Sequence, residues 1–272
     1  MNTPSHPRIP TPGEPAREAI PALMEAYGGR IYALGLRVCP TPTEAEDLVQ
    51  ETMVQALRGW RSFKGDSQPY TWLFRIAMRT CRRMHRKRAG EPDDFLTLDE
   101  LLGFGDQASL QRSPTQAAAW QGDAAAERAT RRRLDAALHQ VPAPFRVALV
   151  LKDIADFSVE ETAEILGVKT ATVKTRVHRG RLHLRRALED QGVFAPLPPT
   201  QVPRRVCLDL LHAKLEAMDR GVDFPLPHGE ICDRCYALFR SLDLAREACA
   251  SLREGSVPAT LRERIQALLE EA

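Results

Sequence analysis

The sequence lacks several features that would place the chain in a common class. Its net charge is only +2, from 38 basic and 36 acidic residues, so positive charge that meets a partner must be local. No apolar run is long enough to span a membrane, and residues 1–15 contain no apolar segment typical of a secretory signal. We therefore expect a cytoplasmic protein with no membrane partner, in which six cysteines indicate thiols or metal ligands rather than structural disulfides.

Patterns typical of enzymes are missing as well. The sequence shows no nucleophile paired with a base and no Gly-rich loop for phosphates. The metal ligands described below would fill all four positions around an ion and leave none for a substrate. These absences predict a protein that is not an enzyme.

The strongest functional pattern is a helix-turn-helix at residues 157–186. Ser158 and Glu161 have the spacing of a capping box at the start of the first helix. Gly167 is placed to end that helix and allow a sharp turn. The second helix carries one apolar stripe at steps of three and four residues. The stripe consists of Val173, Val177, Leu184 and Leu188.

The second helix has the composition of a DNA-recognition helix. Residues 169–186 contain seven Lys or Arg and no acid. Short polar side chains and arginines can reach base edges in the major groove, and flanking cations neutralise phosphates. A solvated basic helix is the alternative, but the capped first helix and the Gly turn favour DNA binding. The predicted DNA-binding residues here are Thr172, Lys174, Thr175, Arg176, His178, Arg179 and Arg181.

The N-terminal half contains two further helices with distinct faces. Thr43 and Glu46 predict a capping box for a helix over 43–60, whose outer face is acidic. A helix over 70–88 has aromatic residues at one end and arginines at the other, which suits a single-stranded nucleic acid. For the aromatic residues Trp72 and Phe74 alone, a core position is the favoured interpretation.

Three motifs in this order resemble regions two and four of the extracytoplasmic-function (ECF) sigma factors of bacterial RNA polymerase. They are EAEDLVQETMVQAL, FKGDSQPYTWLFRIAMRTCRR and the helix-turn-helix, and together they cover roughly residues 20–188. The resemblance implies that the acidic helix docks on the beta-prime clamp of core polymerase. It also implies that the loop 63–68 and the helix after it open the minus-ten element, and that the helix-turn-helix binds the minus-thirty-five element of promoter DNA.

The resemblance carries specific residues over to this chain. The implied core-polymerase contacts are Asp47, Gln50 and Glu51. The implied minus-ten contacts are Arg75, Arg79, Arg82 and Arg83.

The expected fold is all-α, with two helical sigma domains and a small helical domain at the C-terminus. Composition and the resemblance together imply a disordered tail (1–15), sigma region 2 (16–90), a linker (91–126), sigma region 4 (127–189), a Pro-rich linker (190–203) and a cysteine-rich metal-binding regulatory domain (204–272).

The C-terminal segment contains a set of metal ligands. His228, Cys232 and Cys235 follow one another at steps of four and three, which would place them on one helical face. Cys207 opens an upstream helix that a turn at 221–227 can fold back onto them. One His and three Cys suit zinc or a similar soft ion. His212 is an alternative to His228 as the histidine ligand.

Three other cysteines have different expected roles. On one continuous helix Cys249 would lie about 21 Å from Cys235, but a break near Ser241 or Asp243 would let it join as a fifth ligand. Cys39 and Cys81 lie within apolar stripes and are expected in the core.

The pattern H-x3-C-x2-C with an upstream Cys is similar to the zinc-binding anti-sigma domain, here fused to a sigma factor. Such a fusion resembles the CorE-like ECF sigma factors, which implies that metal binding switches transcription on. The tail has no C-x-C pair, which is associated with the copper-responding members, so zinc or cadmium is favoured over copper.

The predicted function is therefore a sigma factor that directs RNA polymerase core to promoters and is regulated in cis by metal. Three alternatives stay open: a purely structural zinc in the tail, a thiol redox switch there, or a free-standing metal-responsive DNA-binding regulator. The acidic helix followed by the aromatic and basic helix argues against the last.

Overall fold

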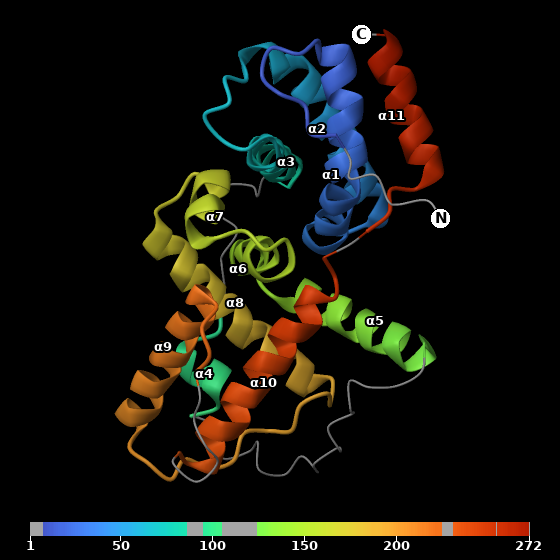
Figure 1. The fold of residues 1–272 in the computed structure, drawn as a ribbon. Coiled ribbons are helices and arrows are strands. Elements are labelled where there is room, and N and C mark those ends of the chain that lie inside the picture. The colour runs from blue at the N-terminus through green and yellow to red at the C-terminus, as the bar shows by residue number, and fades with distance from the viewer. Residues whose placement is uncertain (1–7, 86–94, 105–123, 225–230, 254, 272) are drawn as a thin grey trace, which may run out of the picture.

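The computed structural model describes residues 8–85, 95–104, 124–224, 231–253 and 255–271, and its regular elements in these ranges are helices (Figure 1). This confirms the predicted all-α class. In chain order they are α1 (Ala16–Val38), α2 (Pro42–Gly59), the 3₁₀ turn η1 (Trp60–Ser62), α3 (Pro69–Met84), α4 (Leu98–Leu102), α5 (Ala124–Gln140), α6 (Ala143–Leu149), the π-helical turn η3 (Val150–Ile154), α7 (Val159–Leu166), α8 (Thr170–Asp190), α9 (Arg204–Arg220), α10 (Asp233–Ala250) and α11 (Ala259–Glu271). Among the described helices, none has both the length and the hydropathy that crossing a membrane requires.

The first helical body consists of α1, α2 and α3. The capping box of α2 is formed by Thr41 and Glu44, so the predicted pair Thr43 and Glu46 was wrong. Pro42 explains the earlier start, because proline has no N–H to satisfy and its fixed φ suits the first helical position. Large side chains fill the core between the three helices: Leu48, Met53, Trp60, Leu73 and Phe74.

The second helical body contains α5 to α8 and includes the helix-turn-helix. Ser158 and Glu161 form the predicted capping box at the start of α7, and Gly167 ends α7 in the left-handed conformation at φ 65°. Gly180 lets α6 lie directly beneath α8, because a Cβ at this position would be only 3.0 Å from the carbonyl oxygen of Phe145. The capping box and the Gly167 turn are local features that the sequence predicted, whereas the contact at Gly180 joins two helices.

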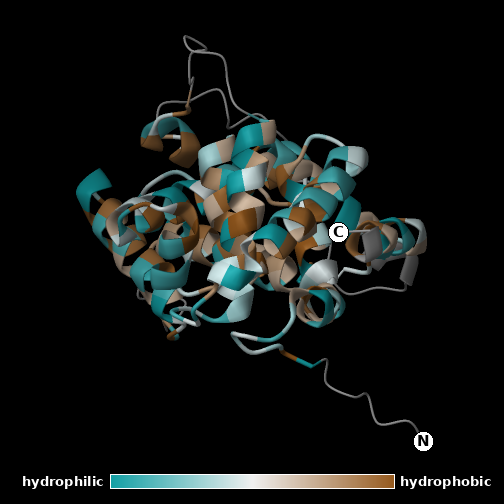
Figure 2. Ribbon diagram, turned by 90° about the horizontal axis from the view of Figure 1, so that it is seen from above, coloured by the Kyte–Doolittle hydropathy of each residue, from teal (hydrophilic) through white to brown (hydrophobic). Residues whose placement is uncertain are grey.

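The two helical bodies pack against each other and share one hydrophobic core. The ring of Tyr70 on α3 stacks on Phe157 with 4.9 Å between centroids, and its hydroxyl donates a hydrogen bond to Glu161 at 2.8 Å. From α1, Arg30 donates to the carbonyl oxygen of Ala155 at 2.9 Å. Viewed from above, hydrophobic residues gather on the inward faces of the helices and hydrophilic residues on the outward faces (Figure 2).

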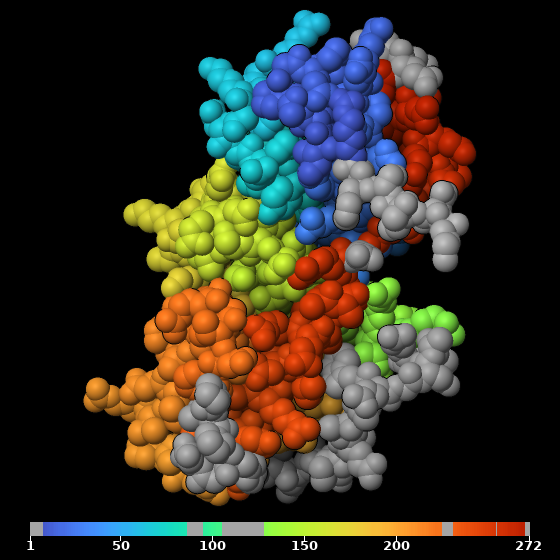
Figure 3. Space-filling view, in the orientation of Figure 1, coloured from blue at the N-terminus to red at the C-terminus, as the bar shows by residue number. Residues whose placement is uncertain are grey.

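The C-terminal segment divides between the two bodies. α9 and α10 pack against α8 and form a second hydrophobic core with α4, to which Leu101 and Leu102 contribute. α11 leaves this group and lies against α1 and α2 at the other end of the molecule (Figures 1 and 3). The last helix of the chain thus packs on the first body. The predicted linker 91–126 contains a short helix, α4, which is part of the second hydrophobic core.

Candidate nucleic-acid interface and metal centre

The recognition helix α8 is only partly open to solvent. Thr175 is exposed, and Thr172 and Arg176 are half-buried. Arg179 is also half-buried and donates a hydrogen bond to the carbonyl oxygen of Leu96 at 3.3 Å. The rest of the predicted DNA-binding face is in contact with the tail.

Two carboxylates of α9 cover the cations of α8. Glu216 accepts from the ammonium of Lys174 at 2.7 Å. Asp219 is paired with Nε2 of His178 at 2.8 Å and with the guanidinium of Arg181 at 2.7 Å. The acidic face of α9 therefore occupies the place on α8 where DNA phosphates would be expected to lie.

The charges at this contact support each other. The pKa of the Asp219 carboxyl is lowered, because burial opposes ionisation but the hydrogen bond with His178 and the charge of Arg181 outweigh it. The hydrogen bond between Lys174 and Glu216 lowers the pKa of the carboxyl and raises the pKa of the ammonium. The contact between α9 and α8 is therefore ionic at neutral pH.

The structure corrects the prediction that Arg181 lies on the DNA-binding face. Arg181 is 3% exposed, and its guanidinium makes two 2.8 Å bonds to the carboxylate of Asp153, beneath α8. Arg185, one turn further along α8, is buried as well and donates to Ser241 and Glu189. A guanidinium bound on two sides in the interior holds helices together and does not contact bases in this conformation.

The predicted minus-ten arginines of α3 differ in their surroundings. Arg79 is exposed, as is Arg82. Arg75 pairs with Glu164 of α7, and Arg83 pairs with Glu51 of α2 at 2.6 Å. The arginines of α3 are thus partly exposed and partly neutralised by neighbouring acids.

The aromatic residues beside the 63–68 loop belong mainly to the core, as the favoured interpretation predicts. Phe74 is fully buried. The ring of Phe63 lies 5.2 Å from that of Trp60 and 5.1 Å from that of Trp72. The cluster fixes the start of α3 relative to α2.

The implied core-polymerase residues lie along the outer face of α2. Asp47 is exposed, and Gln50 and Glu51 are half-buried. One turn away, Glu46 is 3.6 Å from the guanidinium of Arg264 on α11. The last helix of the chain therefore reaches the edge of this acidic face.

Three cysteines of the tail meet at the start of α9 and α10. Their sulfur atoms all lie within 4.8 Å of one another, and those of Cys207 and Cys235 are 3.8 Å apart. Sulfur ligands around tetrahedral zinc at 2.3 Å are about 3.8 Å apart. Cys207, Cys232 and Cys235 therefore fit a thiolate metal site.

The local structure around these cysteines differs from the predicted helical face. α10 begins at Asp233, and Cys232 is its N-cap with extended backbone angles, so Cys232 precedes the helix and does not share a helical face with Cys235. Burial works to raise the pKa of the Cys232 thiol, but the backbone N–H groups of Cys235, Gln201 and Arg234 lower it overall, which favours the thiolate that binds metals.

The other predicted ligands have separate outcomes. His228 lies outside the described residues. The ring of His212 packs against that of His178 at 6.3 Å, and its imidazole is not part of the cysteine cluster. α10 runs unbroken to Ala250, and Cys249 is buried in the other hydrophobic core. His212 and Cys249 are therefore not ligands of this cluster in the structure.

Sequence reasoning missed the two acids of α9. Glu216 and Asp219 are one turn apart on the same helix as Cys207, and that spacing was the available signal. Arg234 was missed too, although it stands between two cysteines. Its guanidinium donates to the carbonyl oxygens of Pro198 and Leu102, which ties the cysteine cluster to α4.

The protein combines a basic helix-turn-helix with a second helical body that carries an acidic helix and an arginine-rich helix. This combination is typical of one class of protein, the DNA-binding factors of the transcription machinery. Comparisons with known proteins give the family. Residues 23–91 match Sigma-70 region 2, and residues 131–184 match Sigma-70, region 4. The described tail helices α9 to α11 lie beyond both matches.

Similar proteins of known function agree with these matches. The chain is 31% identical over 174 residues to the ECF RNA polymerase sigma factor SigW of Bacillus subtilis, covering 64% of this chain and 91% of SigW. It is 31% identical over 181 residues to the RNA polymerase sigma-H factor of Pseudomonas aeruginosa, covering 64% and 88%. The sigma factor RpoE of Bartonella quintana, in complex with the anti-sigma factor NepR, is 25% identical over 64% of this chain and 92% of that one, with a TM-score of 0.37.

The chain belongs to the ECF sigma factors of RNA polymerase. It is accordingly a non-enzymatic initiation factor that binds RNA polymerase core and promoter DNA and directs promoter-specific transcription.

Proposed function

We propose that this sigma factor is regulated in cis by its own tail, and that a metal ion bound by Cys207, Cys232 and Cys235, with His228 as the fourth ligand, switches it on. Zinc or cadmium is favoured over copper. The ion would join two helices through its thiolate ligands and neutralise their charge.

The observation that carries this proposal is the position of α9. Its first turn holds Cys207, and its last turns hold Glu216 and Asp219, which pair with the recognition helix. A change in the angle between α9 and α10 at the cysteines would therefore move the acids that cover α8.

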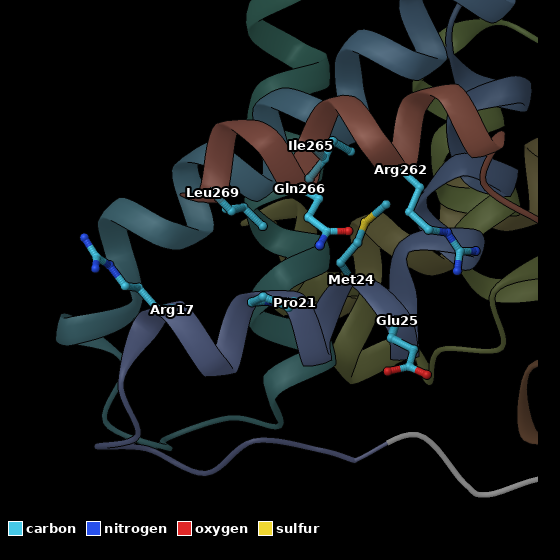
Figure 4. Close-up of a pocket in the computed structure, with 8 residues that line it drawn as sticks. All are labelled: Arg17, Pro21, Met24, Glu25, Arg262, Ile265, Gln266 and Leu269. Carbon is cyan, nitrogen blue, oxygen red and sulfur yellow. The ribbon is translucent and has the colours of Figure 1, made fainter. Parts of the chain in front are cut away.

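A second contact joins the tail to region 2. Ile265 and Leu269 of α11 face Pro21 and Met24 of α1 across a groove of about 480 Å³ (Figure 4). Ile265 is 2% exposed, so this is a packed contact. With α9 on one body and α11 on the other, the tail would hold regions 2 and 4 in their packed arrangement and keep them from spreading along a promoter.

Run-off transcription tests the proposal. Metal-stripped full-length protein is combined with core polymerase and its promoter, and cadmium, zinc and copper are titrated separately. We expect one ion to raise the amount of transcript for the wild type but not for Cys232→Ala. Cys249→Ala, which removes a cysteine of α10 outside the cluster, should respond like the wild type.

The other outcomes contradict metal regulation in distinct ways. Equal transcript with and without every ion would indicate a structural zinc. A response to thiol oxidants and reductants alone would indicate a redox switch. A normal metal response in Cys232→Ala would remove the cysteine cluster from the mechanism.

A further inference from the structure

A second group of soft ligands lies in region 2, remote in the sequence from the cysteines of the tail. Cys39 directly follows α1, Cys81 lies in the last turn of α3, and His85 is the C-cap that follows α3. One ligand atom from each, two sulfurs and an imidazole nitrogen, lies within 4.8 Å of the others. The fold thus brings together three residues from two separate helix ends.

Ordinary core packing explains the two cysteines but not the histidine. Cys39 is 1% exposed and Cys81 is 5% exposed, as expected of small apolar side chains. Nε2 of His85, however, is buried and has no hydrogen-bond partner among the residues that the structure describes. A buried polar atom without a partner costs stability, and coordination to a metal would satisfy it.

The cluster has an open side through which an ion could enter. Cys81 and His85 line a groove of about 800 Å³ between α3 and α6, whose wall also includes Pro144 and Arg146. Water or a further group in this groove could supply a fourth ligand. The groove lies where regions 2 and 4 meet, so it is part of the packed arrangement of the protein.

We propose that Cys39, Cys81 and His85 form a second metal site, which takes a soft divalent cation such as zinc or cadmium. Two thiolates and one neutral imidazole balance the charge of a divalent ion and match its ligand preference. Arg146 also lines this groove, and its guanidinium donates to the carbonyl oxygens of His139 at 2.8 Å and Val38 at 3.4 Å.

The site would fix the end of α3 to the end of α1. Arg82 and Arg83 lie in the same final turns of α3 and are implied minus-ten contacts. A bound ion would therefore order the helix end that presents them. This site is separate from the tail cluster and does not depend on the proposed regulation.

Metal stoichiometry of a full-length protein without the tail site tests the proposal. In a variant with Cys207, Cys232 and Cys235 all changed to Ser, we expect about one equivalent of zinc by competition with a chromophoric chelator. Cobalt substitution should give the charge-transfer absorption of thiolate ligands. Adding Cys81→Ser or His85→Gln should abolish this binding.

A matched control distinguishes the loss of a ligand from poor folding of the variant. Cys249→Ser in the same background removes a buried cysteine outside both clusters, and it should retain the bound ion. The tail variant itself leaves region 2 unchanged, so a tail variant that binds no metal overturns the proposal. A Cys39–Cys81 disulfide that forms under mild oxidant in a protein that binds no metal would also overturn it, in favour of a redox pair.

Discussion

Replacing Asp219 with Asn should release the recognition helix from the tail. The side chains of Asp219 and Arg181 are 2% and 3% exposed, so their 2.7 Å bond is a buried, charge-assisted one. Arg181 keeps both bonds to Asp153 in the variant, so the loss of its bond to Asp219 costs about 1.5–3 kcal/mol, the range for a hydrogen bond to a charged group. That energy corresponds to roughly a ten- to hundredfold shift from the covered to the open state.

The neighbouring ion pair predicts a smaller effect. The side chains of Lys174 and Glu216 are 39% and 27% exposed, and pairs of this kind contribute about 0–1 kcal/mol. Glu216→Gln should therefore shift the same equilibrium by roughly fivefold at most. Asp219→Asn should therefore have the larger effect on this equilibrium, although each variant removes one charge. This difference is itself a test, because it depends on how deeply each side chain is buried.

Fluorescence anisotropy with duplex DNA that carries the minus-thirty-five element measures the shift directly, using metal-free full-length protein. Asp209→Asn is the matched control: it removes the same charge from the same helix, at a side chain that is 74% exposed. Asp219→Asn should bind at least tenfold more tightly than this control. Equal affinities for the two variants would refute the claim that α9 competes with DNA for α8.

Three further predictions concern stability. Burial and the charge of Arg179 lower the pKa of His183 in the folded protein to about 4, whereas the histidine of the unfolded chain takes up a proton below about pH 6.5. The free energy of unfolding should therefore fall by about 2 kcal/mol between pH 8 and pH 5. Thermal unfolding of His183→Phe should lack this dependence on pH. Arg181→Met would leave buried carboxylates unpaired and should cost about 3–5 kcal/mol in chemical denaturation, whereas a cost below about 1 kcal/mol would contradict the structural role of the arginine. Tyr70→Phe removes the hydroxyl bonded to Glu161 and should cost about 1 kcal/mol, with faster proteolysis between regions 2 and 4 and no loss of helical circular dichroism.

Much of the fold could be predicted because its signals are local. Ser158, Glu161 and Gly167 define the helix-turn-helix within ten residues, and the structure has the predicted capping box and turn. The start of α2 was misplaced because two threonines offered the same spacing. The proline after Thr41 decided between them.

The site could be predicted only in part. Spacing indicated Cys207, Cys232 and Cys235 as a group, and the structure brings them together. The same reasoning placed Arg181 on a DNA-binding face, although its partner Asp153 lies 28 residues earlier and holds it in the interior. Helical periodicity gives the face on which a residue lies, but not the charge that another helix brings to it.

The sequence by itself determined the long helices of regions 2 and 4, the helix-turn-helix and the family motifs, because capping, periodicity and turn formation depend on residues a few positions apart. Only the tertiary structure decided that α9 covers the recognition helix, that α11 crosses to region 2, and that Cys39, Cys81 and His85 meet. These contacts join segments separated by dozens to hundreds of residues. Their formation depends on how buried surfaces and charges fit together in three dimensions, which a local sequence pattern does not predict.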